Sequence, residues 1–150
     1  MADDAVLDTI ETQVAMLMRL GEATRRATEL KPHRALDRSA YVILRHLQAA
    51  GPLNVSALAD RLNLDGSTVT RQVTALEKDG LVQRRPDPRD GRGTVIAPTA
   101  SGLAQVDAVR KARREVYDVV LGDWSPRDRA QLAAVLERLT DTLDGYLRRS

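Results

Sequence analysis

Two short apolar stripes, joined by a tight connection, constrain the fold of this 150-residue chain more than any other feature of its sequence. Their residues recur at helical spacing, with Leu58 and Leu62 in the first stripe and Val69, Val73 and Leu76 in the second. Such spacing puts the side chains on one face of an α-helix. The connection LNLDG (62–66) leaves room only for a turn. The sequence therefore predicts a helix-turn-helix.

Residues that favour helix ends flank both stripes. Asn54 and Asp65 stand where the two helices would begin, and their side-chain oxygens can accept hydrogen bonds from the free amides of a first helical turn. Gly80 predicts a left-handed stop after the second helix, and Leu81 supplies the apolar contact that accompanies such an end. These residues predict two capped helices between residues 54 and 81.

Two short β-strands are expected next. The segments VQRRP (82–86) and TVIAP (94–98) are typical of strands. The intervening DPRDGRG (87–93) would then form the tip of a β-hairpin. A hairpin directly after a helix-turn-helix is a winged helix, so the predicted fold class is mainly α with a small β-wing.

The face of the second helix opposite its apolar stripe is polar and basic. It carries Ser67, Arg71, Thr74 and Lys78, with Thr68 on the flank of the first turn. Arginine can bind guanine through two hydrogen bonds in the major groove, and short hydroxyl side chains can bind phosphates or base edges. A solvated helix face has a similar composition, but its place after a short helix and a tight turn favours a DNA contact.

Arginine also concentrates on the hairpin, at Arg84, Arg85, Arg89 and Arg92. A hairpin tip of this size can reach a minor groove, where narrow A·T-rich segments attract arginine. Asp87 stands two residues before Arg89 and can hold its guanidinium by a charge-assisted hydrogen bond. Such a bond would orient the arginine before DNA arrives and reduce the rotamer entropy lost on contact.

The segment STVTRQVTALEKDGLVQRRPDPRDGRG (67–93) closely resembles the MarR family of bacterial transcription regulators. The family's wing signature, Asp-x-Arg-(Ser/Asp)-x-Arg, is matched by Asp87, Arg89, Asp90 and Arg92, and its recognition-helix pattern is matched over residues 67–82. The order of helices also fits over nearly the whole chain. The sequence departs from the family at three positions, namely Gly66, where Arg, Lys or Pro is common, Gly93 in the wing's return strand, and Pro98, which replaces the usual Leu.

The resemblance implies a winged helix-turn-helix core flanked by N- and C-terminal dimerisation helices. Within the single chain 1–150, residues 37–98 would form the DNA-binding lobe. Residues 1–31 and 99–150 would form the helical dimerisation lobe.

The resemblance also implies roles for individual residues. Ser67, Thr68 and Arg71 match positions that enter the major groove, and Arg89 matches the wing arginine that inserts into the minor groove, oriented by Asp87. Family members often touch phosphates where Ser39 and Ser56 stand. The expected DNA-binding residues are Ser39, Ser56, Ser67, Thr68, Arg71, Thr74, Lys78, Asp87, Arg89 and Arg92.

The N-terminal segment predicts two helices. The first carries an apolar stripe at helical spacing, formed by Val6, Ile10, Val14, Leu17 and Leu20. It should end near Leu30, because Pro32 disfavours a helical residue before it. A second helix is expected from about Ser39 to Ala50, where Gly51 and Pro52 stop it.

Two further helices are expected after the wing. Thr99 can cap one that runs to about Leu121, and Ser125 and Pro126 suit the cap and the first position of the last helix. Packing within one chain would explain the last helix's apolar stripe, but we favour a homodimer interface formed by the first helix and the last two. A two-fold dimer would double the contacts of one recognition helix. The stripe comprises Leu132, Val135, Leu136, Leu139, Leu143, Tyr146 and Leu147.

The run VRKARRE (109–115) has four basic residues in five positions. On a helix these charges spread around the circumference. We therefore favour a solvated surface over a second DNA contact.

Composition excludes several other kinds of site. The chain has no cysteine, which removes disulfides, thiolate metal sites and thiol-based redox sensing. His33 and His46 are too few for a metal site of their own, so neither a metal nor a cofactor is expected. Nothing resembles a nucleophile with its base or a phosphate-binding glycine loop, and we expect no enzyme activity.

No signal peptide and no uncharged apolar segment of membrane-spanning length is visible. Together with the absence of cysteine, this predicts a cytoplasmic protein without a membrane partner.

These observations predict a sequence-specific DNA-binding transcription regulator. As a homodimer it would bind a pseudo-palindromic double-stranded operator whose half-sites lie roughly 10 base pairs apart. The resemblance implies a repressor that is released by a small anionic aromatic ligand, with His33 as a candidate pocket residue. The alternative is a winged-helix protein-interaction module without DNA binding, since a fold does not fix function.

Overall fold

The computed structural model describes residues 2–27 and 36–150 of the chain. Its elements are, in chain order, α1 (Ala2–Ala27), α3 (Arg38–Ala50), α4 (Val55–Leu62), α5 (Gly66–Lys78), β1 (Val82–Pro86), β2 (Thr94–Pro98), α6 (Ala100–Val120) and α7 (Pro126–Leu147). The predicted fold class is confirmed, because the chain is mainly helical with one small antiparallel sheet. The expected end of the first helix near Leu30 and the candidate His33 lie outside the described residues.

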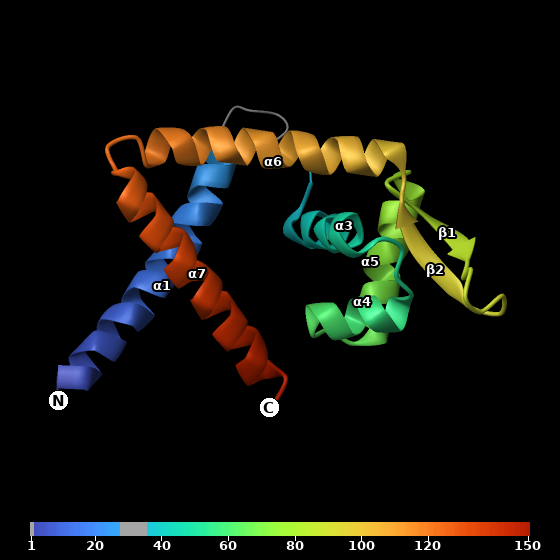
Figure 1. Cartoon of the computed structure of the whole chain (residues 1–150), viewed down its shortest axis with the longest axis horizontal. Coiled ribbons are helices and arrows are strands. Elements are labelled where there is room, and N and C mark those ends of the chain that lie inside the picture. The colour runs from blue at the N-terminus through green and yellow to red at the C-terminus, as the bar shows by residue number, and fades with distance from the viewer. Residues whose placement is uncertain (1, 28–35) are drawn as a thin grey trace.

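Helix α6 runs along the molecule and connects two groups of elements (Figure 1). Helices α3, α4 and α5 and the β1–β2 hairpin lie beneath the end where α6 begins. Helices α1 and α7 extend from the other end of α6. The helix-turn-helix and its wing therefore form one group, which α1 contacts near its C-terminal end and α7 contacts just past its last residue.

The hydrophobic core lies within the first group. Its fully buried side chains come from α3, α4, α5, β1, β2 and the first half of α6, and the largest are Ile43, Leu44, Leu47, Leu58, Ile96, Val69, Val73, Val82, Val106 and Val109. Four of the five residues of the two predicted stripes are buried, and the fifth, Leu62, packs partly buried against the same core. The stripes of α4 and α5 thus fix which faces these two helices turn outward.

The predicted helix ends are confirmed at α4 and α5. The side chains of Asn54 and Asp65 each accept a hydrogen bond, 2.7 Å long, from the backbone amide three residues further on. Gly80 has a φ of 73°, and the amide of Leu81 donates to the carbonyl of Leu76 at 2.9 Å. This bond and the positive φ form the expected left-handed helix end. Helix α3 begins one residue earlier than expected, because Asp37 caps it by accepting from the amide of Ala40.

The two wing strands have the predicted bounds. They pair in antiparallel register from Val82 opposite Pro98 to Pro86 opposite Thr94. Backbone hydrogen bonds of 3.1 and 2.7 Å between Leu53 and Ile96 tie the wing to the segment before α4. The base of the wing is thereby part of the core, and its tip projects from the molecule (Figure 1).

Helix α6 sits directly on the turn that ends α5. The Thr99 hydroxyl donates to the carbonyl of Gly80 at 2.6 Å, and the Thr99 amide donates to the carbonyl of Leu81 at 3.0 Å. Gly102 allows this approach, since a Cβ atom there would overlap the Leu81 carbonyl. Two hydrogen bonds therefore join the start of α6 to the turn that follows α5.

The terminal helices leave their apolar faces exposed. No residue of α7 is buried, and none is buried among residues 3–27 of α1. Val135 and Leu143 of α7 are 64% and 50% exposed, and Leu7 and Leu17 of α1 are 57% and 60% exposed. Packing against the described residues therefore does not bury the stripe on α7. Among the helices of residues 2–27 and 36–150, none combines the length and the hydropathy that a membrane span requires.

Candidate nucleic-acid interface

The polar face of α5 points away from the core, as its stripe dictates. Four of its expected contact residues are exposed, namely Ser67, Arg71, Thr74 and Lys78, and Thr68 is half-buried. Because Val69, Val73 and Leu76 are all buried on the opposite face, these side chains cannot turn inward without breaking the core.

Asp65 gathers the hydroxyl groups at the start of α5. Its carboxylate accepts from the Ser67 hydroxyl at 2.6 Å, from the Thr68 amide at 2.7 Å and from the Thr68 hydroxyl at 2.9 Å. These bonds, above all the one from Ser67, lower the pKa of Asp65 to about 2. Since both hydroxyl protons point to Asp65, Ser67 and Thr68 present acceptor lone pairs to their surroundings.

Arg84 links the wing to the recognition helix. Its Nε lies 3.4 Å from Glu77 Oε1, and its Nη2 lies 3.4 Å from the Thr74 hydroxyl oxygen. The Thr74 hydroxyl in turn donates to the carbonyl of Thr70 at 2.8 Å. Arg84 was expected among the positive charges of the wing but is paired with α5. Its contact also engages the hydroxyl oxygen of Thr74.

The wing tip is held by two aspartates. Asp87 Oδ1 accepts from the backbone amide of Arg89 at 2.9 Å, and Asp90 Oδ1 accepts from the amide of Arg92 at 3.1 Å. Gly93 closes the loop, because its carbonyl accepts from the Asp87 amide and its amide donates to the Asp90 carbonyl, both at 2.9 Å. The prediction that Asp87 binds the Arg89 guanidinium is wrong. Among the described residues, the Asp87 carboxylate binds the backbone amide of Arg89 instead. A guanidinium on a long side chain can remain mobile, whereas the backbone amide lies within reach of the carboxylate two residues before it.

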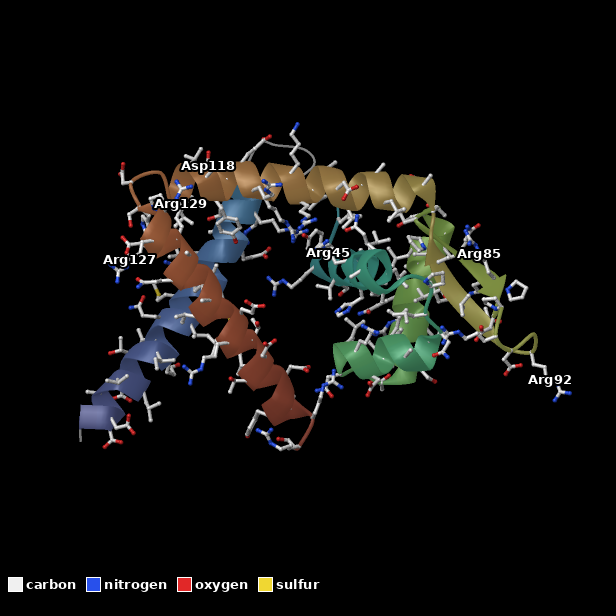
Figure 2. All side chains as sticks on the ribbon, viewed as in Figure 1. Arg45, Arg85, Arg92, Asp118, Arg127 and Arg129 are labelled. Carbon is white, nitrogen blue, oxygen red and sulfur yellow. The ribbon has the colours of Figure 1, made fainter. Side chains whose placement is uncertain are left out.

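Four cations on the polar face of α5 and at the wing tip are unpaired among the described residues. Within the part of the chain that the structure describes, the side chains of Arg71, Lys78, Arg89 and Arg92 form no ion pair or hydrogen bond, and all four are exposed. Figure 2 shows Arg92 at the wing tip, directed away from the rest of the molecule. These cations are available to an anionic partner, unlike Arg84.

Ser39 and Arg71 line one hollow between the start of α3 and α5. The hollow has a volume of about 470 Å³ and is also lined by Gln72, which the sequence did not single out. Gln72 could have been found from its place next to Arg71 and four residues after Thr68 on the helix. Ser56 is exposed in the first turn of α4 and does not line this hollow.

A second cluster of charge lies where α1, α3 and α6 meet. Glu22 Oε2 lies 3.4 Å from Arg38 Nη2, and Glu22 Oε1 lies 3.7 Å from Arg25 Nη1. The Arg113 guanidinium lies 4.1 Å from the centre of the Tyr41 ring, so one member of the basic run 109–115 faces inward. Arg25 Nε is buried and has no hydrogen-bond partner among the described residues.

This cluster encloses a pocket of about 200 Å³, lined by Gly21, Glu22, Arg25, Arg38, Arg113 and Tyr117. Three arginines face one carboxylate there, so the pocket carries an excess of positive charge. No sequence motif connects these residues, since they come from three helices that only the tertiary fold brings together.

The described residues form no cluster suited to a metal ion. Across residues 2–27 and 36–150, no three His, Cys, Asp or Glu side chains are grouped so that they could hold one.

The sequence is similar to known transcription regulators. Residues 36–94 match the MarR family. The chain is 38% identical to YxaD of Bacillus subtilis, an uncharacterized HTH-type transcriptional regulator, over 69% of this chain and 73% of YxaD. It is 28% identical to the HTH-type transcriptional repressor NicR of Pseudomonas putida, over 93% of this chain and 89% of NicR.

The fold is similar to that of a solved structure from the same family. A MarR family protein from Bacillus stearothermophilus matches with a TM-score of 0.78 over 93% of this chain and 96% of that chain, at 21% sequence identity. The sequence relatives are transcription regulators and not enzymes.

Proposed function

Since this chain belongs to the MarR family of DNA-binding transcription regulators, we propose that it is a repressor that binds a pseudo-palindromic operator as a homodimer. Residues 37–98 would form its DNA-binding lobe, and residues 1–31 and 99–150 its dimerisation lobe. The observation that carries this proposal is the set of four unpaired, exposed cations on α5 and the wing tip. NicR, which is named a repressor, aligns over 93% of this chain and supports the direction of regulation.

The proposed contacts follow from the hydrogen bonds of each side chain. Arg71 has a free guanidinium and would bind a guanine in the major groove. Ser67 would accept from the amino group of adenine or cytosine, because its own proton is directed to Asp65. Arg89 and Arg92 would enter the minor groove on either side of the wing tip.

The remaining expected residues would hold the DNA backbone. Lys78, Ser39 and Ser56 are exposed and would bind phosphates. Thr68 and Thr74 have hydroxyl protons engaged within the protein, so each would contribute an acceptor. Asp87 would act through the loop backbone of the wing.

The exposed terminal helices support the homodimer. The chain has an accessible surface of 10852 Å², whereas a compact monomer of this mass would have about 7,600 Å². The excess, roughly 3,300 Å², exceeds the area that each partner buries in an interface of standard size, about 800 Å². Association of α1 and α7 with a second copy would bury their apolar faces.

The pocket of Arg25, Arg38 and Arg113 supports release by a small anionic ligand. A ligand carboxylate would balance the positive charge there, and the Tyr117 ring that lines the pocket suits an aromatic group. The pocket lies between α1, α3 and α6, so a ligand would contact both groups of elements and could change their relative position.

Binding to the promoter region of the protein's own gene tests the proposal. The purified protein should bind that DNA with an affinity that falls steeply as salt rises, because cations on α5 and the wing displace counterions from phosphates. Fluorescence anisotropy with a labelled promoter fragment and an unrelated fragment of equal length, at several salt concentrations, measures the sequence preference and the salt dependence of binding. Equal and salt-independent affinity for the two fragments would contradict the proposal and favour the protein-interaction module.

A further inference from the structure

The end of α7 contacts the first helix of the helix-turn-helix. Arg148 Nη1 lies 3.4 Å from Asp60 Oδ1, and Arg148 Nη2 donates to the carbonyl of Arg61 at 3.3 Å. Asp60 and Arg61 belong to the last turn of α4, which ends at Leu62. The last turn of a helix carries free carbonyl groups and partial negative charge, so it attracts a guanidinium.

The neighbouring turn of α7 orients Arg148 for this contact. Arg148 Nε donates to Asp144 Oδ2 at 2.7 Å, and this bond raises the pKa of Arg148. The side chains of Arg148 and Asp60 are 36% and 80% exposed. An ion pair at such exposure adds little to stability, but with the bond to the Arg61 carbonyl it places the end of α7 beside the last turn of α4.

The other end of α7 is fixed as well. Arg129 Nη2 and Nε donate to the carbonyl of Leu121 at 2.7 and 3.0 Å, and Nη1 lies 3.0 Å from Asp118 Oδ1. Figure 2 shows Arg129 and Asp118 at the junction of α6 and α7. Helix α7 therefore joins the C-terminal end of α6 to α4. The N-terminal end of α6 is bonded to the turn that follows α5 (Figure 1). These connections close a ring within one chain.

We propose that α7 acts as a strut that fixes the helix-turn-helix relative to the terminal helices, and that Arg148 is the positioning residue that makes the protein selective for one half-site spacing. This inference rests on the proposed function, since spacing has meaning only for a dimer on a two-part operator. One added base pair moves a half-site by about 3.4 Å and rotates it by about 34°. A helix-turn-helix that is held both by α6 and by the Arg148 contact at α4 resists this movement of the half-site. Without the contact at α4, the helix-turn-helix can move with the half-site.

Operators that differ only in half-site spacing test this role. The wild type should bind the native spacing at least about tenfold more tightly than spacings one base pair longer or shorter. In Arg148→Ala this ratio should fall below about threefold, with affinity for the native operator reduced much less. Arg149→Ala is the matched control, because it removes the same charge one residue away and its side chain forms no ion pair with the described residues. An unchanged ratio in Arg148→Ala, or an equal loss in Arg149→Ala, would overturn the inference.

A distance measurement without DNA separates this inference from the proposed function. The chain has no cysteine, so Ala49→Cys in α3 and Glu137→Cys in α7 can carry the only two spin labels, in protein diluted with unlabelled chains. Arg148→Ala should broaden the distance distribution between the labels, and Arg149→Ala should not. A distribution that stays narrow in Arg148→Ala overturns the strut. Broadening together with a wild type that binds no operator would instead overturn the proposed function.

Discussion

Single residues at this surface differ in whether they are free to meet DNA. Arg71, Lys78, Arg89 and Arg92 are unpaired within the described chain, whereas Arg84 is committed to Glu77 and Thr74. Charge alone does not separate these two groups, since all five are cationic. We therefore propose that the four unpaired side chains bind DNA and that Arg84 positions the wing against α5.

Arg71→Ala should relax sequence preference. If its guanidinium binds a guanine, the variant should lose about 1–3 kcal/mol of binding free energy on the native operator. It should lose little on an operator in which that base pair has been replaced. Lys78→Ala is the comparison, because loss of a phosphate contact weakens binding about equally on all sequences. Affinities measured on a set of single-base operator variants distinguish the two. Uniform weakening by Arg71→Ala would place it on a phosphate.

Asp87→Ala should weaken operator binding although it removes a negative charge. The reason is that Asp87 fixes the backbone amide of Arg89, so its loss leaves the tip less ordered before DNA arrives. Asp87→Asn keeps a side-chain acceptor and removes the charge, and it should bind at least as tightly as the wild type. Operator titrations of both variants measure this. Tighter binding by Asp87→Ala would show that bulk charge dominates.

Asp65 should keep its charge in unusually acidic solution. Its pKa is lowered from 3.8 to about 2 by the Ser67 and Thr68 hydrogen bonds. Because the folded-state pKa lies below the unfolded one, ionised Asp65 stabilises the fold above about pH 4, and this contribution is lost as pH falls to about 2. Carbon NMR of the carboxyl group measures the titration. In Asp65→Asn this part of the pH dependence of the free energy of unfolding should be absent.

At the scale of elements, the sequence predicts best what neighbouring residues decide. The caps at Asn54 and Asp65, the stop at Gly80 and both wing strands depend on local hydrogen bonds and turn chemistry, and all are found where expected. The link from Arg84 to Glu77 joins a strand to a helix, and the Arg25, Arg38 and Arg113 cluster joins three helices. Such contacts depend on the tertiary arrangement and leave no periodic pattern in the chain.

The junction of α5, β1 and α6 should tolerate no side chain at Gly102. Gly102→Ala forces α6 away from the Leu81 carbonyl and should lower the free energy of unfolding by about 1–3 kcal/mol, as overpacking does. Gly66→Ala is the control, since nothing lies within 4 Å of a Cβ atom there. Thermal unfolding compares the two, and equal melting temperatures would contradict the close packing described for this junction.

At the scale of the whole molecule, the chain has a compact winged helix and an open pair of terminal helices. The described residues leave most of the apolar faces of α1 and α7 exposed. A second copy that covers them would also place two recognition helices on one DNA duplex. The proposed dimer thus connects burial of apolar surface to recognition of a two-part operator.

Leu143→Glu should break that dimer. Leu143 lies on the apolar stripe of α7 and is half exposed in the single chain, so a carboxylate there would be buried without a partner on association. Ala134→Glu adds the same charge on the opposite face of α7 and should leave the dimer intact. Sedimentation velocity gives the oligomeric state of each variant. A dimer that persists in Leu143→Glu would place the interface elsewhere.

The affinity of Arg89→Ala for the operator tests the central claim most directly. Arg89 is exposed, its guanidinium is unpaired within the described residues, and its backbone is fixed by Asp87. We predict that Arg89→Ala binds the operator more weakly than the wild type, with the largest loss on operators whose flanks are A·T-rich. Affinity equal to that of the wild type on every flank would contradict the assignment of the wing to DNA.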